Sequence, residues 1–342
     1  MKAKNPWQRT IERYRIRRMK HLAALFLMLL GMSVQSTFAC DLCAVYSVSN
    51  AQGESSGFLF TAAEQFIPFR NLQFEGKSIS VSNPEFLDSS ITHLVPGYNF
   101  TGHFGLSLNI PIISRSYRFY NQAAAREGSV AGFGDIALIG RWSAWQQTKK
   151  DYSVRLQLLG GVKFPTGDAD FVQKDVEQEV FFNSFFPAGH NHAISGVHPH
   201  DLALGSGSFD GVIGTTLNLR WKRAFFTTEF QYYLRTEGES SFKYGDDLMV
   251  SGGPGYFLLL NERYSLSLQG NAVYETMARS EYFDRKSNQT GSTAWYFGPQ
   301  LGLTMGNHFS ARAGVDVPLQ IENNGLQNVP DYRIHASVTW SF

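Results

Sequence analysis

Four of the nine histidines in the chain lie close together, His190 with His192 and His198 with His200. Imidazole is the commonest protein ligand for transition metals. In an extended chain, the two rings of each His-x-His pair project to the same side. The spacing therefore predicts a site for zinc or copper, although the chain shows no motif that requires a cofactor. The alternative interpretation is a solvated surface loop, in which histidine simply suits irregular chain.

The two cysteines of the chain, Cys40 and Cys43, form a Cys-x-x-Cys motif. Alanine rather than histidine follows Cys43, which excludes the motif of c-type haem attachment. A disulfide in an oxidising compartment, ligation of a soft metal and acylation of Cys40 remain as interpretations. Thr37 disfavours acylation, because lipoprotein signals carry leucine at that place. We therefore predict either a disulfide or a metal ligand pair.

Charged residues recur at alternate positions of segments that are otherwise apolar. Rings of charge along the lumen of a membrane protein set which solutes pass. We therefore predict a pore lined by Arg141, Arg155, Lys163, Arg220, Glu229, Arg235, Arg312, Asp316 and Arg333, with Asp135, Asp210 and Glu275 on the same side. The alternative is that these charges pair with one another and fill a closed lumen.

Two other classes of function find little support in the sequence. Gly205-Ser206-Gly207-Ser208 lies at the start of a strand, not in the strand-turn-helix setting of a nucleophile elbow. We therefore expect no enzymatic activity. A nucleic-acid partner is not expected either, because the chain has no basic stripe beyond its first residues.

The elements that must position these residues alternate with a period of two. From Tyr152 to Asp168 and again from Gly205 to Trp221, apolar side chains occupy one face and polar ones the other. This period is typical of β-strands. The histidine loop between the two segments is too long for an ordinary connection in a compact domain.

Twelve such segments follow one another, and the connections between them are alternately long and short. They are Phe58–Phe69, Ile91–Phe100, Phe104–Ile113, Phe133–Trp142, Tyr152–Asp168, Gly205–Trp221, Ala224–Arg235, Leu248–Leu260, Tyr264–Met277, Trp295–Met305, Phe309–Ile321 and Asp331–Phe342. Long external loops and short periplasmic turns are typical of outer-membrane barrels, in which every backbone polar group is paired. Trp142, Trp295 and Trp340 lie where an interfacial aromatic girdle would need them.

We therefore predict an all-β fold, a transmembrane antiparallel up-and-down barrel of about 12 strands with both termini periplasmic. The membrane is the bacterial outer membrane, and its lipids are the first expected partner. A secreted β-sandwich is the alternative, but its outward faces would be polar.

The first 39 residues have the pattern of a secretory signal. Eight basic residues precede the apolar run Leu22–Val34, and Thr37-Phe38-Ala39 offers small residues at the two positions that a signal peptidase reads. Met19 is an alternative start. The expected organisation is a signal peptide over 1–39, a periplasmic segment with the cysteine pair over 40–56, and the barrel over 57–342. Because the leader holds these basic residues, the near-neutral total charge of +1 conceals an acidic mature chain.

The last segment alternates without interruption and ends in Phe342. A terminal aromatic on such a strand resembles the signal that the barrel assembly machinery of bacteria recognises. This machinery is therefore an expected partner.

Three motifs together resemble a known family. They are Phe133-Gly134-Asp135-Ile136, Lys163-Phe164-Pro165-Thr166-Gly167-Asp168 and Leu204-Gly205-Ser206-Gly207-Ser208-Phe209-Asp210. Over roughly residues 90–342 the chain resembles the outer-membrane transporter family of the phenol-degradation meta-pathway. The resemblance implies a barrel that transports small, often aromatic compounds. The cysteine pair and the histidine loop are not part of the family pattern.

The motifs also have a structural interpretation. Glycine permits close approach of strands, and Asp135, Asp168 and Asp210 lie where the chain turns and could cap the backbone there. On these grounds the sequence favours an outer-membrane channel or transporter that passes small solutes. The alternative function is a metal-binding or sensing outer-membrane protein that uses the histidine loop and the cysteine pair.

Overall fold

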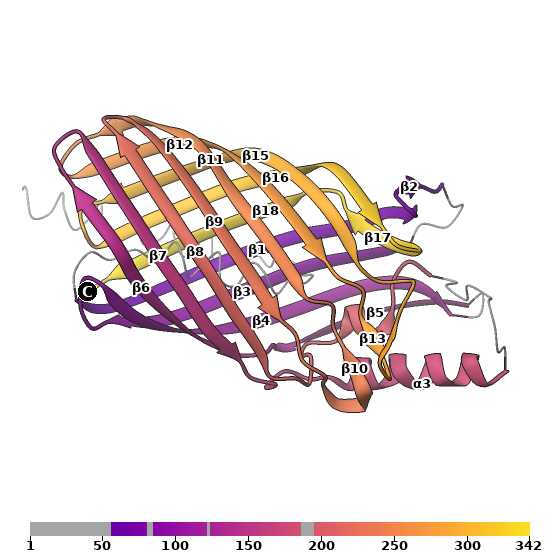
Figure 1. The fold of residues 1–342 in the computed structure, drawn as a ribbon. Helices are drawn as coiled ribbons and strands as arrows, with labels where there is room; N and C mark the ends of the chain where they lie inside the picture. The colour runs from indigo at the N-terminus through magenta and orange to yellow at the C-terminus, as the bar shows by residue number, and fades with distance from the viewer. Residues whose placement is uncertain (1–55, 81–84, 122–123, 186–194) are drawn as a thin grey trace, which may run out of the picture. The chain divides into compact units, whose positions relative to one another are not determined.

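The computed structural model describes residues 56–80, 85–121, 124–185 and 195–342. Within these residues, twelve long antiparallel strands close into one barrel (Figure 1). Each strand pairs with the next along the chain, and the last pairs with the first. In order they are β1 (Gly57–Phe74), β3 (Phe86–Asn99), β4 (Phe104–Asn121), β6 (Ala137–Thr148), β7 (Tyr152–Lys163), β8 (Asp210–Trp221), β9 (Ala224–Leu234), β11 (Asp247–Leu260), β12 (Tyr264–Met277), β15 (Ser292–Met305), β16 (Phe309–Asn323) and β18 (Arg333–Ser341). The predicted fold class is confirmed.

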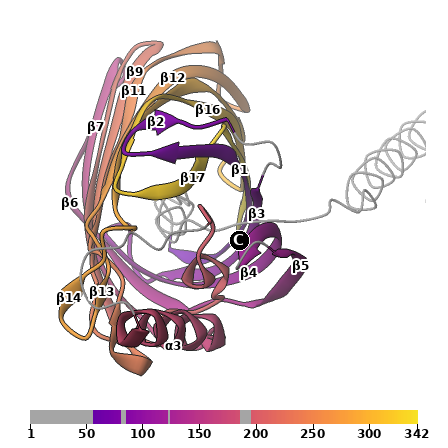
Figure 2. The same cartoon turned by 90° about the vertical axis from the view of Figure 1, so that its right-hand side faces the viewer.

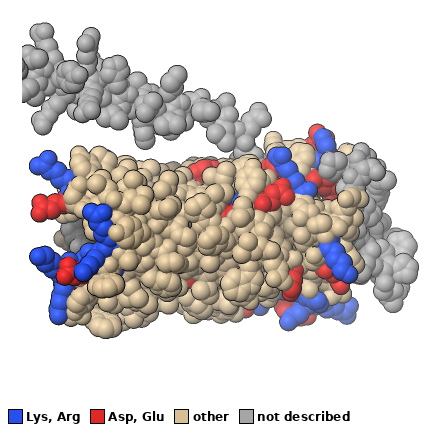
Figure 3. All heavy atoms as spheres, turned by 90° about the horizontal axis from the view of Figure 1, so that it is seen from above, with Lys and Arg blue, Asp and Glu red and all other residues tan. Residues whose placement is uncertain are grey.

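The period of two in the sequence separates an outer from an inner face. In β8, Ile213 is 49% exposed whereas its neighbour Val212 is 2% exposed. Leucine, phenylalanine and tryptophan side chains repeat this outward exposure around the barrel, whereas Lys, Arg, Asp and Glu gather toward the two ends (Figure 3). An apolar band of this kind between two charged rims is the surface that a bilayer covers. In the described part of the chain, no helix is long and apolar enough to cross a membrane.

The two ends of the barrel differ in the length of their connections. At one end, turns such as Thr101–His103, Lys222–Arg223 and Asn261–Arg263 join the strands directly. We call this the turn end, and the opposite one the loop end. β1 begins and β18 finishes at the turn end. Trp142 and Trp340 lie toward the turn end and Trp295 toward the loop end, all three exposed.

The loop end holds more regular structure than the sequence predicted (Figure 2). Residues 118–121 and 124–132 were expected to lie in a loop between the predicted strands Phe104–Ile113 and Phe133–Trp142. Instead, 118–121 continue β4 and 124–132 belong to β5 (Ala124–Phe133), which pairs with β4, so that prediction was wrong. The strand expected over Phe133–Trp142 instead begins at Ala137. The first error arises because a strand outside the bilayer need not carry an apolar outer face, so its sequence lacks alternation. The second arises because Phe133 ends β5, and residues 134–136, which form no strand, separate it from β6.

The other long connections also fold. The histidine loop contains α3 (Asp170–Phe185) and the short 3₁₀ helix η1 (Pro199–Leu202). Short strands pair beyond the barrel, and η2 (Glu239–Ser241) precedes one of them. These strands are β2 (Lys77–Ser78), β10 (Phe242–Lys243), β13 (Glu281–Tyr282), β14 (Arg285–Lys286) and β17 (Leu326–Pro330). The loop end is therefore a folded cap, and each of the six connections there contributes regular structure to it.

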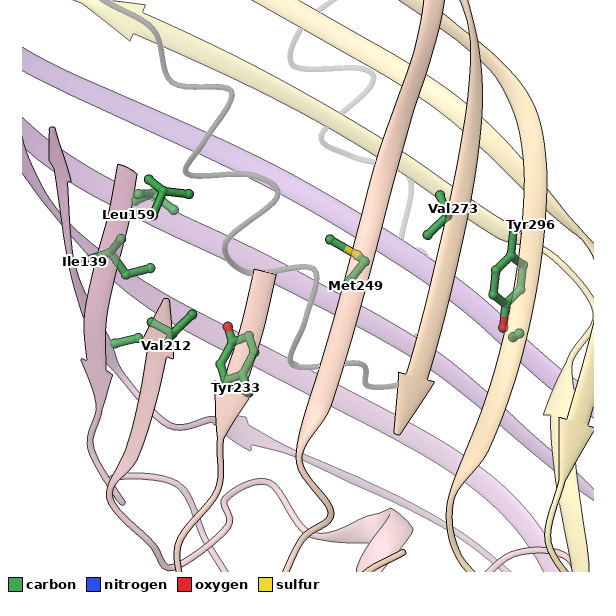
Figure 4. Close-up of a cluster of buried hydrophobic side chains, with 10 residues drawn as sticks. Ile139, Leu159, Val212, Tyr233, Met249, Val273 and Tyr296 are labelled. Atoms are coloured by element: carbon green, nitrogen blue, oxygen red, sulfur yellow. The ribbon is translucent and has the colours of Figure 1, made fainter. Parts of the chain in front are cut away.

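A band of buried apolar side chains lies on the inner face (Figure 4). Successive strands from β6 to β15 contribute to it, and its members share the strand face of the predicted pore charges. The labelled members are Ile139, Leu159, Val212, Tyr233, Met249, Val273 and Tyr296. The interior therefore has an apolar zone as well as a charged one.

Candidate functional site

The predicted pore residues all lie on the inner-facing positions of their strands. Six of them are at most 8% exposed, and Arg155, Arg220 and Arg312 are partly exposed. The six are Arg141, Lys163, Glu229, Arg235, Asp316 and Arg333. Several of these charges pair with one another, which is the arrangement that the closed-lumen alternative describes.

Among the described residues, the largest group of paired charges lies at the loop ends of five neighbouring strands, β6 to β9 and β11. The Lys163 ammonium lies 2.8 Å from carboxylate oxygens of both Asp135 and Asp210. The Arg235 guanidinium then bridges Asp210, at 3.0 Å, and Asp247, at 2.6 Å. All five side chains are buried. A buried charge is tolerated when it is paired and hydrogen-bonded, and each member of this ion-pair ladder has such a partner.

The three motifs of the family resemblance meet at this ladder. The Asp135 carboxylate accepts hydrogen bonds from the backbone N–H of Gly167, at 3.0 Å, and of Ser206, at 2.8 Å. A Cβ atom on Gly205 would lie 2.5 Å from the carbonyl oxygen of Gly167, so the two segments touch only because both are glycine. Asp210 accepts from the N–H of Thr236 at 3.0 Å. The predicted capping of backbone groups by these carboxylates is confirmed.

Two cavities lie in series inside the barrel. The mouth cavity, at the loop end, has a volume of about 210 Å³ and is lined by His200, Arg235, Tyr296 and Arg333 among others. The inner cavity has a volume of about 40 Å³ and is lined by Met249, Val273 and again Arg333 among others. The side chain of Arg333 therefore borders both cavities.

Arg333 is held at this boundary by its neighbours. Its guanidinium pairs with the Glu275 carboxylate and donates to the Tyr296 hydroxyl at 3.0 Å. It also lies over the Tyr296 ring, 3.9 Å from the centroid, which is a cation–π geometry. Further into the barrel, the Asp316 carboxylate lies 3.5 Å from His335. The boundary between the cavities thus consists of one paired cation and an aromatic ring.

The second half of the histidine loop folds back against the mouth of the barrel (Figure 2). His200 is buried, and its Nδ1 lies 2.6 Å from the Asp175 carboxylate of α3. The Tyr282 hydroxyl donates to the same carboxylate. The Tyr244 hydroxyl donates to the backbone oxygen of His200 at 2.9 Å, and the Phe242 ring packs beside the His200 ring. The interpretation of a solvated loop is therefore wrong for this half.

His198 and Asp201 complete the group around His200. The two imidazole rings stack at a centroid distance of 5.4 Å, so the predicted projection to one side is observed for this pair. Burial alone would lower the pKa of His200, but the charges of Asp201 and Asp175 outweigh burial and raise that pKa to about 9. The carboxylates of Asp175 and Asp201 therefore both stabilise the protonated imidazole of His200. His198, His200 and Asp201 could hold a metal ion together.

Several residues of this site carry no local signal in the sequence. Arg115 of β4 donates to the backbone oxygens of Asp201, at 2.7 Å, and of Ala203. Asp175 and Tyr282 reach His200 from elements far along the chain. Only Asp201 was open to prediction, because it directly follows the second His-x-His pair. The predicted ligands His190, His192, Cys40 and Cys43 and the predicted signal peptide lie outside the described residues.

No protein-family model matches the sequence, and a search of curated proteins gives no match. Among solved structures, the chain is similar to an outer-membrane channel from Pseudomonas putida F1, with 12% sequence identity and a TM-score of 0.58. The match covers 91% of this chain and 98% of that one. The β domain of the Bordetella autotransporter Brka (10% identity, TM-score 0.39) matches 84% of this chain and 100% of its own. The NanC porin (11% identity, TM-score 0.35) matches 82% of this chain and 100% of its own.

At this level of identity the similarity to the Pseudomonas channel concerns the fold. The closed barrel and its apolar outer band are features of the protein itself and agree with that fold. The chain is an outer-membrane β-barrel of bacterial type, located in the outer membrane.

Proposed function

We propose that this protein is an outer-membrane channel that passes small, partly apolar solutes. The observation that carries the proposal is the pair of cavities in series, which meet at Arg333. A barrel that served only as an anchor would need no such path. Passage from one cavity to the other requires the Arg333 side chain to move away from Glu275 and Tyr296. Charged groups at a constriction select solutes as they pass.

The inner apolar band supports the proposed class of solute. Tyr296 and Ala294 of this band line the mouth cavity, and Met249 and Val273 line the inner cavity. An engineered apolar cavity of about 150 Å³ is known to hold benzene. The mouth cavity, at about 210 Å³, therefore has room for a single-ring compound. Polar groups beside an apolar wall suit a ring that carries one charged or hydroxyl substituent.

The family resemblance points in the same direction. The glycine-rich motifs place this chain beside the transporter family of the phenol-degradation meta-pathway, whose members are associated with small aromatic compounds. In this chain the motifs build the ion-pair ladder under the mouth cavity. We therefore propose membership of that family and transport of small aromatic compounds.

The test is the conductance of the refolded chain in planar bilayers, with Arg333→Gln as the variant. We expect the variant to conduct more than the wild type and to favour cations, because a shorter neutral side chain leaves the Glu275 carboxylate at the boundary. The matched control is Arg223→Gln in an exposed turn, which removes the same charge at the turn end. Conductance and selectivity that are equal in both variants and in the wild type would contradict the proposed path.

The class of solute is tested separately, with the chain in liposomes. We expect benzoate to enter faster than a monosaccharide of similar size. Met249→Gln should reduce that preference, because it makes the apolar band polar without a large change of volume. A preference that is absent in the wild type would contradict the aromatic solute but not the channel.

A further inference from the structure

We propose that His198, His200 and Asp201 form a binding site for a divalent transition-metal ion at the mouth of the barrel. One ligand atom from each residue lies within 4.8 Å of the others. The proposal does not depend on the channel function. It concerns the folded half of the histidine loop, and it adds two carboxylates to the predicted histidines, Asp201 as a ligand and Asp175 behind His200.

The distances between the donor atoms suit one small ion. The Nε2 atom of His200 lies 3.4 Å from Oδ1 of Asp201, and Nδ1 of His198 lies 3.6 Å from Oδ2 of the same carboxylate. Zinc binds nitrogen and oxygen at about 2.0–2.2 Å, so tetrahedral ligands stand roughly 3.3 Å apart. Small rotations of the two stacked rings would therefore direct all three residues at a single ion.

His200 is oriented as a metal ligand by its other nitrogen. The contact of Nδ1 with the Asp175 carboxylate, at 2.6 Å, leaves Nε2 facing Asp201. Histidines that bind metals commonly donate their second N–H to a carboxylate, which fixes the ring and makes the ligating nitrogen more basic. Tyr282 in turn donates to Asp175 and holds that carboxylate in place. This chain of contacts has the form found around bound zinc.

The backbone of the site is held in place by contacts of its own. Pro199 opens the short helix η1, and the Asp201 carboxylate accepts the backbone N–H of His198 at 2.8 Å. Arg115 donates from the barrel wall to the backbone oxygen of Asp201 at 2.7 Å. A site that is ordered before binding costs less free energy to assemble around the ion.

One ring nitrogen in this group of residues has no hydrogen-bond partner among the described residues. The Nε2 atom of His198 is buried and has no hydrogen-bond partner within the described residues. Buried polar atoms are rarely left unpaired, so the His198 side chain has a capacity to bind a ligand that no described residue uses. Two imidazoles and a carboxylate favour zinc, nickel or copper over calcium or magnesium. Because all three residues line the mouth cavity, a fourth coordination position would be open to water or to a solute.

The experiment is calorimetric titration of the refolded full-length chain with zinc chloride, with Co²⁺ absorption as a second readout of tetrahedral coordination. We expect one site in the wild type. His200→Gln and Asp201→Asn should abolish the binding, and Asp175→Asn should weaken it by about 10–100-fold, as is usual when a carboxylate behind a ligating histidine is removed. The matched control is His103→Gln in an exposed turn at the turn end, which should bind as the wild type does.

A second set of variants separates this site from the other candidate ligands. In a background of Cys40→Ser, Cys43→Ser, His190→Gln and His192→Gln, the zinc site should persist with the same dissociation constant. Heat-modifiable migration in gels verifies that each variant forms the barrel. Binding that is lost in this background, or binding that is unchanged by both His198→Gln and His200→Gln, would overturn the proposal, as would a wild type that binds no metal.

Discussion

The turn end and the loop end of the barrel are built in opposite ways. At the turn end, contacts are local: the Asn261 side chain accepts the backbone N–H groups of Arg263, at 3.0 Å, and of Tyr264, at 2.8 Å. At the loop end, His200 contacts Asp175 and Tyr282, which lie 25 and 82 residues away in the chain. The turn end therefore needs only neighbouring residues to form, whereas the loop end needs several connections to meet. We therefore expect the cap to open as one unit, whereas each turn forms independently of the others.

The largest effect should follow from a change in the ion-pair ladder. Asp210→Asn leaves the cations of Lys163 and Arg235 buried with one counter-charge fewer. Breaking a buried pair in this way costs about 3–5 kcal/mol. We expect that loss in the free energy of unfolding, measured by urea titration in detergent. The matched control at the turn end is Asp151→Asn, an exposed residue whose loss should change stability by less than about 0.5 kcal/mol. Equal effects at the two ends would remove the distinction between them.

An intermediate effect should follow from a change inside the cap. Tyr282→Phe removes the hydroxyl that donates to Asp175, and a hydrogen bond to a charged group contributes about 1.5–3 kcal/mol. We expect the cap to open more often while the barrel stays folded. The measurement is the rate of tryptic cleavage after Lys174, an exposed residue of α3. Tyr264→Phe, in an exposed position at the turn end, should leave that rate unchanged. A cleavage rate that is the same in all three proteins would show that this contact does not hold the cap.

The smallest effect is expected in a turn. Lys222 has a φ of 53°, in the left-handed region, where a residue with a side chain costs roughly 1–2 kcal/mol relative to glycine. Lys222→Gly should relieve this cost, but glycine also loses more conformational freedom on folding. We therefore expect a gain of at most about 1 kcal/mol in the urea titration, with no change in tryptic cleavage of the cap. A loss of stability would mean that the side chain of Lys222 contributes more than the strain of its backbone costs.

The fold was open to prediction because its signals are local. The alternation in β8, the tight turn at Lys222–Arg223 and the aromatic end at Phe342 each occupy a few consecutive residues. β12 was predicted over the very range, Tyr264–Met277, that the structure shows. The errors gather at the loop end, where strands leave the bilayer. There β5 forms without any alternation, because backbone pairing with β4 holds the strand without an apolar outer face.

Some features of the candidate site could likewise be predicted from the sequence, and others could not. Strand parity predicted which charged side chains face the interior, as for Arg141 and Arg333, because a strand with a period of two has only two faces. Strand parity did not predict which charged side chains pair with one another. The partners of Arg235 lie on the two strands beside β9, and the register between these strands sets their depth in the barrel.

The barrel, the orientation of its strand faces and the alternation of short and long connections can all be deduced from the order of the amino acids. The physical reason is that a bilayer imposes the same requirement on every strand: an apolar outer side chain at each second residue, and a paired backbone. Three other features become visible only in the folded chain: the long connections form a cap, His200 is buried beside Asp175, and Arg333 lies between two cavities. Each of these features depends on contacts between residues that are far apart in the sequence. No local sequence pattern predicts such contacts.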